Sequence, residues 1–163
     1  MSGAGGMESE NEQAGAGGEA AAVPEPQPFV CGDPLPAVTF PTVLTSTGTP
    51  PSATGGEITE GLYVLTEVIF YGSYSSVPGD VLAMRPGYFH RRHTTYSTSG
   101  SALTGYEEIG TYATTGQAMA RDVTACGLGS APGLWKFTAT ASQIQLFWTE
   151  GSTTRIDTFE LQP

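Results

Sequence analysis

The stretch "GYFHRRHTTY", residues 87–96, concentrates the side chains best able to do chemistry. It holds both histidines of the chain and two of its six Lys and Arg residues. Imidazole groups bind metals or transfer protons, and guanidinium groups bind anions. A Pro-Gly pair ends the preceding run and two β-branched threonines follow, so residues 88–97 are predicted to form a strand.

Alternation along this strand separates the two histidines. Successive side chains of a strand point to opposite faces, so His90 and His93 are expected on opposite sides. No Asp or Glu lies near them in sequence to complete a ligand set, which disfavours a Zn or Cu site, and no cofactor is expected. Because no nucleophile, paired carboxylate or catalytic motif accompanies them, no catalytic residue is predicted and the chain is not expected to be an enzyme.

One interpretation of the cations is a ligand site at the mouth of a β-barrel. Polar groups at the opening of an apolar cavity are how such folds orient a small amphipathic ligand. The candidate ligand-binding residues share one face of this strand, or lie on the inward face of a later one: Tyr88, His90, Arg92, Tyr96 and Trp148.

The alternative interpretation is structural. On it, the strand reaches a hydrated rim of the fold, and Arg91 and Arg92 pair with nearby acids such as Glu107 or Glu108. The many aromatic residues then fill the core and pair across strands instead of forming a ligand platform.

The elements that must position these residues are strands. From Gly61 onward, short apolar-alternating runs are broken by Gly, Ser and Pro about every 8–12 residues, which is typical of an all-β sandwich or barrel. No window shows a sustained helical stripe. The predicted strands are residues 61–72, 80–85, 88–97, 102–114, 118–126, 134–140, 144–150 and 154–161.

A weak internal repeat indicates how the strands connect. Gly100 and Gly116 are placed to supply the positive φ of tight hairpin turns. Consecutive hairpins make an antiparallel meander, and closure into an up-and-down barrel removes its exposed edges. We therefore predict a barrel of about eight antiparallel strands over residues 57–163. The repeat is "YSTSGSAL" (96–103), "YATTGQAM" (112–119) and "FTATASQI" (137–144).

Two segments precede the predicted barrel. Residues 1–28 are rich in Gly, Ala, Glu and Pro and predict a disordered tether. Residues 29–56 carry five prolines, which exclude regular helix and leave strand only as short edge pieces. They are predicted to form an extended Pro-rich strap and linker that packs four apolar side chains onto the domain: Phe29, Leu35, Phe40 and Val43.

The chain holds two cysteines, Cys31 and Cys126. A lone pair in a chain outside the cytosol most often forms a disulfide, which would fasten the strap to the barrel. Two buried free thiols are the main alternative; a catalytic cysteine is less favoured, because neither Cys stands beside a His or in a C-x-x-C motif.

The motif "GLYVLT" (61–66), followed by the hairpin repeat, resembles the lipocalin-like (calycin-type) barrel domains of bacterial envelope and secreted proteins. The resemblance covers about residues 57–163. It implies that Arg155 of the last strand packs across Tyr63, which stands where lipocalins usually have Trp. The acidic-aromatic turn typical of the middle of that family is not evident. Such domains often follow a Gly-rich tether behind a lipid-modified cysteine, although "QPFVC" lacks the apolar run of a lipid-attachment site.

Composition limits the partners and the location. The 16 Asp and Glu against 6 Lys and Arg give a net charge of −10, which makes nucleic acid an unfavourable partner. No run of about 18 apolar residues exists to span a membrane. The first residues lack the features of a signal peptide, so the chain is either cytosolic or a mature form whose leader has been removed. Scarce lysine and an even cysteine count favour the second, hence an extracellular or cell-envelope location.

These observations predict a non-enzymatic module that binds a small hydrophobic or amphipathic ligand inside a β-barrel. The alternative is a packed barrel that acts structurally, contacting a protein partner or further copies of itself. Alternation alone does not distinguish them, because a barrel of about eight strands is either just filled by its own side chains or just open.

Overall fold

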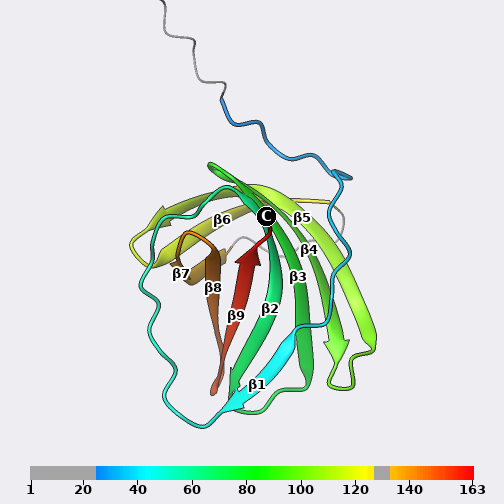
Figure 1. The fold of residues 1–163 in the computed structure, drawn as a ribbon, viewed down its shortest axis with the longest axis vertical. Coiled ribbons are helices and arrows are strands. Elements are labelled where there is room, and N and C mark those ends of the chain that lie inside the picture. Colours follow the sequence, from blue (N-terminus) through cyan, green and yellow to red (C-terminus); the bar gives the residue numbers. More distant parts are fainter. Residues whose placement is uncertain (1–24, 127–132) are drawn as a thin grey trace, which may run out of the picture.

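The structure is a computed structural model that describes residues 25–126 and 133–163 (Figure 1). Most of the predicted tether, residues 1–24, lies outside the described residues. In the two described ranges no helix is long and apolar enough to cross a membrane. The strands are β1 (Thr42–Ser46), β2 (Gly61–Tyr71), β3 (Ser76–Arg85), β4 (Tyr88–Ser97), β5 (Ala102–Thr115), β6 (Ala118–Ala125), β7 (Gly133–Ala139), β8 (Gln143–Glu150) and β9 (Thr153–Leu161).

Strands β2 to β9 form a closed antiparallel barrel. Each strand pairs with the next along the chain, and β9 returns to pair with β2. The closing register runs from Tyr63 opposite Leu161 to Tyr71 opposite Thr154, with an irregularity between Leu65 and Glu67. The predicted eight-stranded meander barrel is confirmed, and each of the eight predicted strands is present.

The largest difference in a strand boundary is at the start of β3. This strand begins at Ser76, before Pro78 and Gly79, whereas the sequence predicted a start at Asp80. Residues 76–80 pair with β4 but not with β2, which meets β3 only near its other end. Proline is tolerated there because one edge of the strand does not need its N–H.

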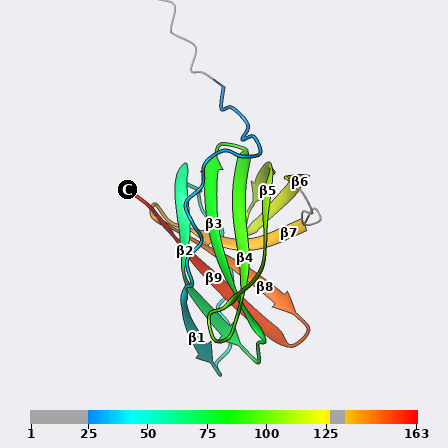
Figure 2. The ribbon, with the colours of Figure 1, turned by 90° about the vertical axis from the view of Figure 1, so that its right-hand side faces the viewer.

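Strand β1 occupies the edge that β3 leaves open. It pairs in parallel with the second half of β2, from Thr42 opposite Glu67 to Ser46 opposite Tyr71. It is one of the short edge pieces that the prolines of the strap still allowed. Figure 2 shows β1 beside the lower part of the barrel, reached by the strap that descends along the outside of the strands.

The two ends of the barrel differ. At the plugged end, defined by the turns 86–87, 116–117 and 140–142, residues 53–60 lie against the strand ends. Gly55 forms backbone hydrogen bonds with Phe137 and Ala139 of β7. The other end, defined by the loops 72–75, 98–101 and 151–152, is called the mouth below.

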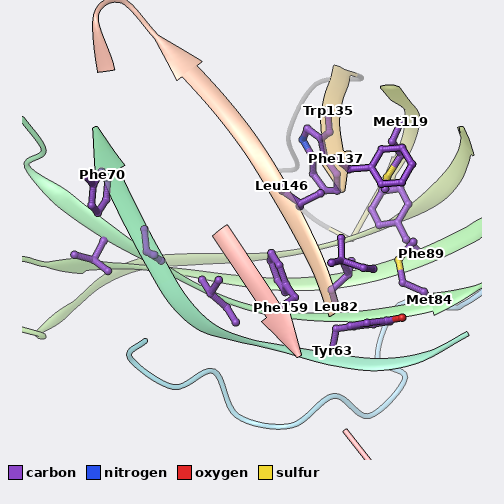
Figure 3. Close-up of a cluster of buried hydrophobic side chains, with 14 of the residues drawn as sticks. Tyr63, Phe70, Leu82, Met84, Phe89, Met119, Trp135, Phe137, Leu146 and Phe159 are labelled. Atoms are coloured by element: carbon purple, nitrogen blue, oxygen red, sulfur yellow. The ribbon is translucent and has the colours of Figure 1, made fainter. Parts of the chain in front are cut away.

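The lumen at the plugged end is filled by apolar side chains. Figure 3 shows most of this cluster together, with Phe70 set apart at the other end of β2. Members of the cluster that are almost completely buried include Tyr63, Leu82, Met84, Phe89, Met119, Phe137, Leu146 and Phe159. Burial of this surface is the main favourable contribution to folding.

Glycine is required where residues 53–60 pass closest to the barrel. Gly55 has a φ of +76°, and a Cβ there would lie 2.2 Å from the backbone oxygen of Gly116. Gly116 and Gly100 themselves have φ values of +58° and +88°, as the hairpin repeat predicted.

Substitution at Gly55 tests this packing. Gly55→Ala is expected to lower the free energy of unfolding by about 2–5 kcal/mol, because it combines a left-handed backbone with a clash against backbone atoms. Gly151→Ala is the matched control: its φ is +58° but nothing lies within 4 Å of the added Cβ, so a loss of about 1–2 kcal/mol is expected. Denaturant unfolding followed by circular dichroism measures both. Equal losses would contradict the close packing of residues 53–60 on the plugged end.

Candidate functional site

Strand β4 presents different chemistry to the two sides of the barrel wall, as its alternation predicted. Phe89 pairs with Met84 of β3 and belongs to the lumen core. Arg91 and His93 follow on the same face and therefore also point into the lumen. His90 lies on the outer face, so the prediction that the histidines point to opposite sides is confirmed.

The strap covers the outer face of β4. His90 is completely buried there and its Nε2–H donates to Glu107 Oε1 at 2.8 Å. Arg92 Nη1 donates to the carbonyl oxygen of Leu35 at 2.8 Å, and the Tyr96 hydroxyl donates to that of Val38 at 3.1 Å. The expected position of Tyr88, His90, Arg92 and Tyr96 at the mouth of the lumen is therefore corrected. They lie on the outer face, because the face that carries Phe89 is the one that points into the lumen.

A disulfide fixes the start of the strap. Cys31 and Cys126 are bonded, as predicted, across a sequence separation of 95 residues. Beside it, the Gly32 N–H donates to Glu107 Oε1, and the Arg85 guanidinium lies 4.2 Å from the centre of the Phe29 ring. Burial acts to raise the pKa of Glu107, but hydrogen bonds from His90 and Arg92 outweigh it and hold this pKa below its usual value.

The middle of the lumen holds a layer of buried charges. Arg91 is 3% exposed and donates from Nε and Nη2 to the two oxygens of Asp80, at 2.7 and 3.0 Å. Its Nη1 lies 3.3 Å from Glu108 Oε1, to which Arg121 also donates at 2.8 Å. Arg91 and Arg92 were expected to pair with nearby acids such as Glu107 or Glu108, and they do: Arg91 contacts Glu108 and Arg92 contacts Glu107. However, the Arg91 pair is enclosed in the barrel and not at a hydrated rim.

The charges in this layer hold one another ionised. Burial acts to raise the pKa of Asp80, but Arg91 and His93 outweigh it, so the pKa lies below its usual value. Burial acts to lower the pKa of Arg91, and Asp80 reverses this and raises it. In Arg121 burial prevails over Glu108 and lowers the pKa. A buried cluster of this kind costs desolvation energy that only close, hydrogen-bonded partners offset.

Two groups cover the charged layer on the side of the mouth. His93 Nδ1 lies 2.9 Å from Asp80 Oδ1, and its Nε2 lies 3.1 Å from the hydroxyl of Thr95. Arg91 Nη1 donates to the Tyr106 hydroxyl at 3.2 Å, and burial raises the pKa of that phenol. The histidine in the lumen is thus a partner of a buried carboxylate.

Two tryptophans extend the layer across the lumen. The Arg121 guanidinium lies 3.7 Å from the centre of the Trp135 ring system, which meets Trp148 edge to face at 5.3 Å. Arg155 in turn lies 5.1 Å over Trp148. Such stacks favour a guanidinium over other cations. The expectation that Trp148 faces inward is confirmed.

Arg155 takes a different role from the one the lipocalin resemblance implied. It lies near the mouth over Trp148, while Tyr63 lies at the plugged end, paired with Leu161 and bonded through its hydroxyl to the Thr59 carbonyl at 2.7 Å. The implied packing of Arg155 across Tyr63 is wrong. An arginine does pack on a buried aromatic ring in this barrel, but the pair is Arg121 and Trp135.

An ion pair joins the charged layer to the mouth. Arg155 donates from Nη2 to Asp157 Oδ2 at 2.8 Å, and its Nε lies 2.8 Å from Oδ1. Asp157 is fully buried, whereas the Arg155 side chain is 25% exposed. Burial raises the pKa of Asp157, Arg155 counteracts this, and the nearby Asp80 adds to the rise. The pair therefore links a fully buried acid to a cation that solvent reaches.

A cleft of about 470 Å³ opens at the mouth above this pair. Phe70 and Tyr74 stack face to face on one side, with ring centres 4.1 Å apart. The indole N–H of Trp148 is shielded from solvent and finds no acceptor among the described residues. The lining residues are Phe70, Ser73, Tyr74, Ser75, Ser76, Trp148, Glu150, Thr153 and Arg155.

Of the predicted ligand-binding residues, the structure therefore brings only Trp148 to this cleft. The sequence analysis did not place Phe70, Tyr74 or Arg155 at a cleft. Their signal was available: Phe70 and Tyr74 flank the end of a strand, and Arg155 follows the last turn of the chain. In the described ranges no three His, Cys, Asp or Glu side chains come together as a metal site.

The fold and the cleft together define a closed eight-stranded antiparallel barrel with a charged lumen and a hollowed mouth. Comparisons with models of protein families, with curated proteins and with solved structures found nothing that matches this chain.

Replacing an arginine on each face of β4 should show that the lumen-side arginine contributes more to stability than the outer-face arginine. Arg91→Met is expected to lower the free energy of unfolding by about 3–5 kcal/mol, because Asp80 stays buried without its bidentate partner. Arg92→Met, whose side chain is 34% exposed, should cost only about 1 kcal/mol. Denaturant unfolding at neutral pH measures both, and similar losses would contradict the enclosed position of Arg91.

Proposed function

We propose that the protein is a non-enzymatic binding module that holds a small amphipathic ligand in the cleft at the mouth of its barrel. The observation that carries this proposal is the cleft itself, in which the partly exposed Arg155 meets a group of aromatic rings. Its volume falls within the range of about 300–1,000 Å³ in which proteins bind small molecules.

The lining suits a ligand with a flat apolar body and a polar end. Phe70, Tyr74 and Trp148 offer ring faces for the body, and aromatic faces bury large apolar area with defined geometry. Arg155 offers a charged donor for the polar end, and the serines of the 72–75 loop and Ser76 of β3 offer hydroxyl groups. Glu150 is exposed at the rim, where water solvates its charge.

The depth of the site is limited by the barrel's own contents. Apolar side chains fill the lumen at the plugged end, and the layer around Arg91 fills its middle. A ligand thus occupies the mouth and does not extend through the barrel. A purely structural barrel would have the same packed lumen. The structural alternative therefore predicts the same fold but no saturable ligand binding.

We further propose that the module works outside the cytoplasm, in the cell envelope or the secreted space. The disulfide between Cys31 and Cys126 supports this location, because such bonds persist in oxidising compartments and are rare elsewhere.

Binding of 1-anilinonaphthalene-8-sulfonate, a fluorescent amphipathic anion, tests the site. We expect saturable binding to the full chain. The double variant Arg155→Gln with Asp157→Asn replaces the ion pair by neutral groups of similar size and should weaken binding about tenfold or more, since a charge-assisted hydrogen bond contributes about 1.5–3 kcal/mol. Circular dichroism verifies that the variant is folded.

Two further variants serve as controls, one for the loss of a positive charge and one for the loss of an ion pair on the outer face. Lys136→Gln removes one exposed positive charge from the outside of β7 and should leave binding unchanged. Arg92→Gln with Glu107→Gln neutralises the matching pair beneath the strap. Binding that is lost in this variant but kept in the Arg155 variant would move the site to the outer face of β4. Absence of saturable binding would favour the packed structural barrel.

A further inference from the structure

We infer that the ligand of the mouth cleft is an anion with a flat apolar body, and that its binding is coupled to the uptake of one proton by Asp157. This inference rests on the proposed function and adds the charge of the ligand and the pH dependence of its capture. It is based on the position of one ion pair. Arg155 lines the cleft, and its partner Asp157 is fully buried in the interior.

Arg155 is the only cation that lines the cleft among the described residues. An anion entering there meets a guanidinium whose Nη2 already donates to Asp157 and whose Nε lies 2.8 Å from the same carboxylate. Two anionic groups then compete for one cation in a partly enclosed site, where charges interact more strongly than in water. Of the two anionic groups, the Asp157 carboxylate is the one that has no access to water.

The surroundings of Asp157 decide how it responds. Its cross-strand neighbours, Val68 of β2 and Leu146 of β8, carry no charge. The charged groups that act on it are Arg155 on its own strand, Asp80 of β3 and Arg91 of β4. Arg91 is held by both oxygens of Asp80, which also contacts His93, so the second cation that acts on Asp157 already has a partner of opposite charge.

A bound anion therefore raises the pKa of Asp157 further. The anion competes for the Arg155 guanidinium, which favours the ionised form of Asp157. It also adds a negative charge near Asp157, which already lies near the negative charge of Asp80. Burial already places this pKa above its usual value in the free protein. The proton goes to a carboxylate oxygen of Asp157, and a neutral carboxylic acid then remains beside Val68 and Leu146.

The sign of the pH dependence follows from linkage. When the pKa of Asp157 is higher in the complex than in the free protein, the complex holds more protons over the interval between the two values. Affinity for the anion then rises as pH falls through this interval, by at most about tenfold per pH unit, and levels off below the lower pKa. A neutral ligand of the same shape shows no such slope.

Naphthalene-2-sulfonate and naphthalene-2-sulfonamide test this on the full chain. The sulfonate stays ionised throughout the working pH range, so any proton taken up enters the protein. We expect the dissociation constant of the sulfonate to fall with decreasing pH, while that of the neutral sulfonamide stays constant. A pH-stat titration in weakly buffered solution should record uptake approaching one proton per bound sulfonate within the same interval.

Variants assign the proton. Asp157→Asn should still bind the sulfonate but abolish both the pH slope and the uptake, whereas His93→Gln should retain them. Sulfonate binding with no uptake in the intact protein would overturn the inference while leaving the proposed function in place. Uptake that survives in Asp157→Asn and disappears in His93→Gln would also overturn it. Failure of both compounds to bind at any pH would remove the site, and the inference with it.

Discussion

The structure depends on one buried interaction, the bidentate contact of Arg91 with Asp80 in the middle of the barrel. A guanidinium enclosed by a barrel wall must find acceptors for its N–H groups, because each buried N–H without a hydrogen bond costs free energy. Asp80, Glu108 and the Tyr106 hydroxyl supply them. Arg91 finds these acceptors on the lumen side of β4, whereas Arg92 on the outer face pairs with Glu107 and with the carbonyl oxygen of Leu35.

The charged layer divides the barrel into two functional halves. Toward the plugged end, side chains pack to exclude water, and residues 53–60 lie against the strand ends. Toward the mouth, the same layer extends through Arg155 and Asp157 to a cleft lined with aromatic rings. The packed apolar core thus lies in one half and the proposed binding site in the other. The disulfide and the strap act on the outer face, where they cover His90 and Arg92.

Local pattern predicted the barrel well because strand alternation and turn glycines are short-range signals. They placed all eight barrel strands and assigned the turns at Gly100 and Gly116. They did not decide which face of β4 is inward. Phe89 and Arg91 share a face with His93, while Tyr88 and Tyr96 made the other face look equally apolar. That choice depends on partners that other segments bring to each face, such as Asp80 for Arg91 and the carbonyl oxygen of Leu35 for Arg92.

Hydrogen exchange of the arginine side chains, measured by NMR on the ¹⁵N-labelled chain, tests the central claim most directly. The five arginines give few Nε–H signals, and single substitutions assign them. The buried contact with Asp80 predicts that the Nε–H of Arg91 exchanges far more slowly than those of Arg85 and Arg92 on the outer face. Exchange of Arg91 as fast as that of Arg92 would contradict a charged layer enclosed in the barrel.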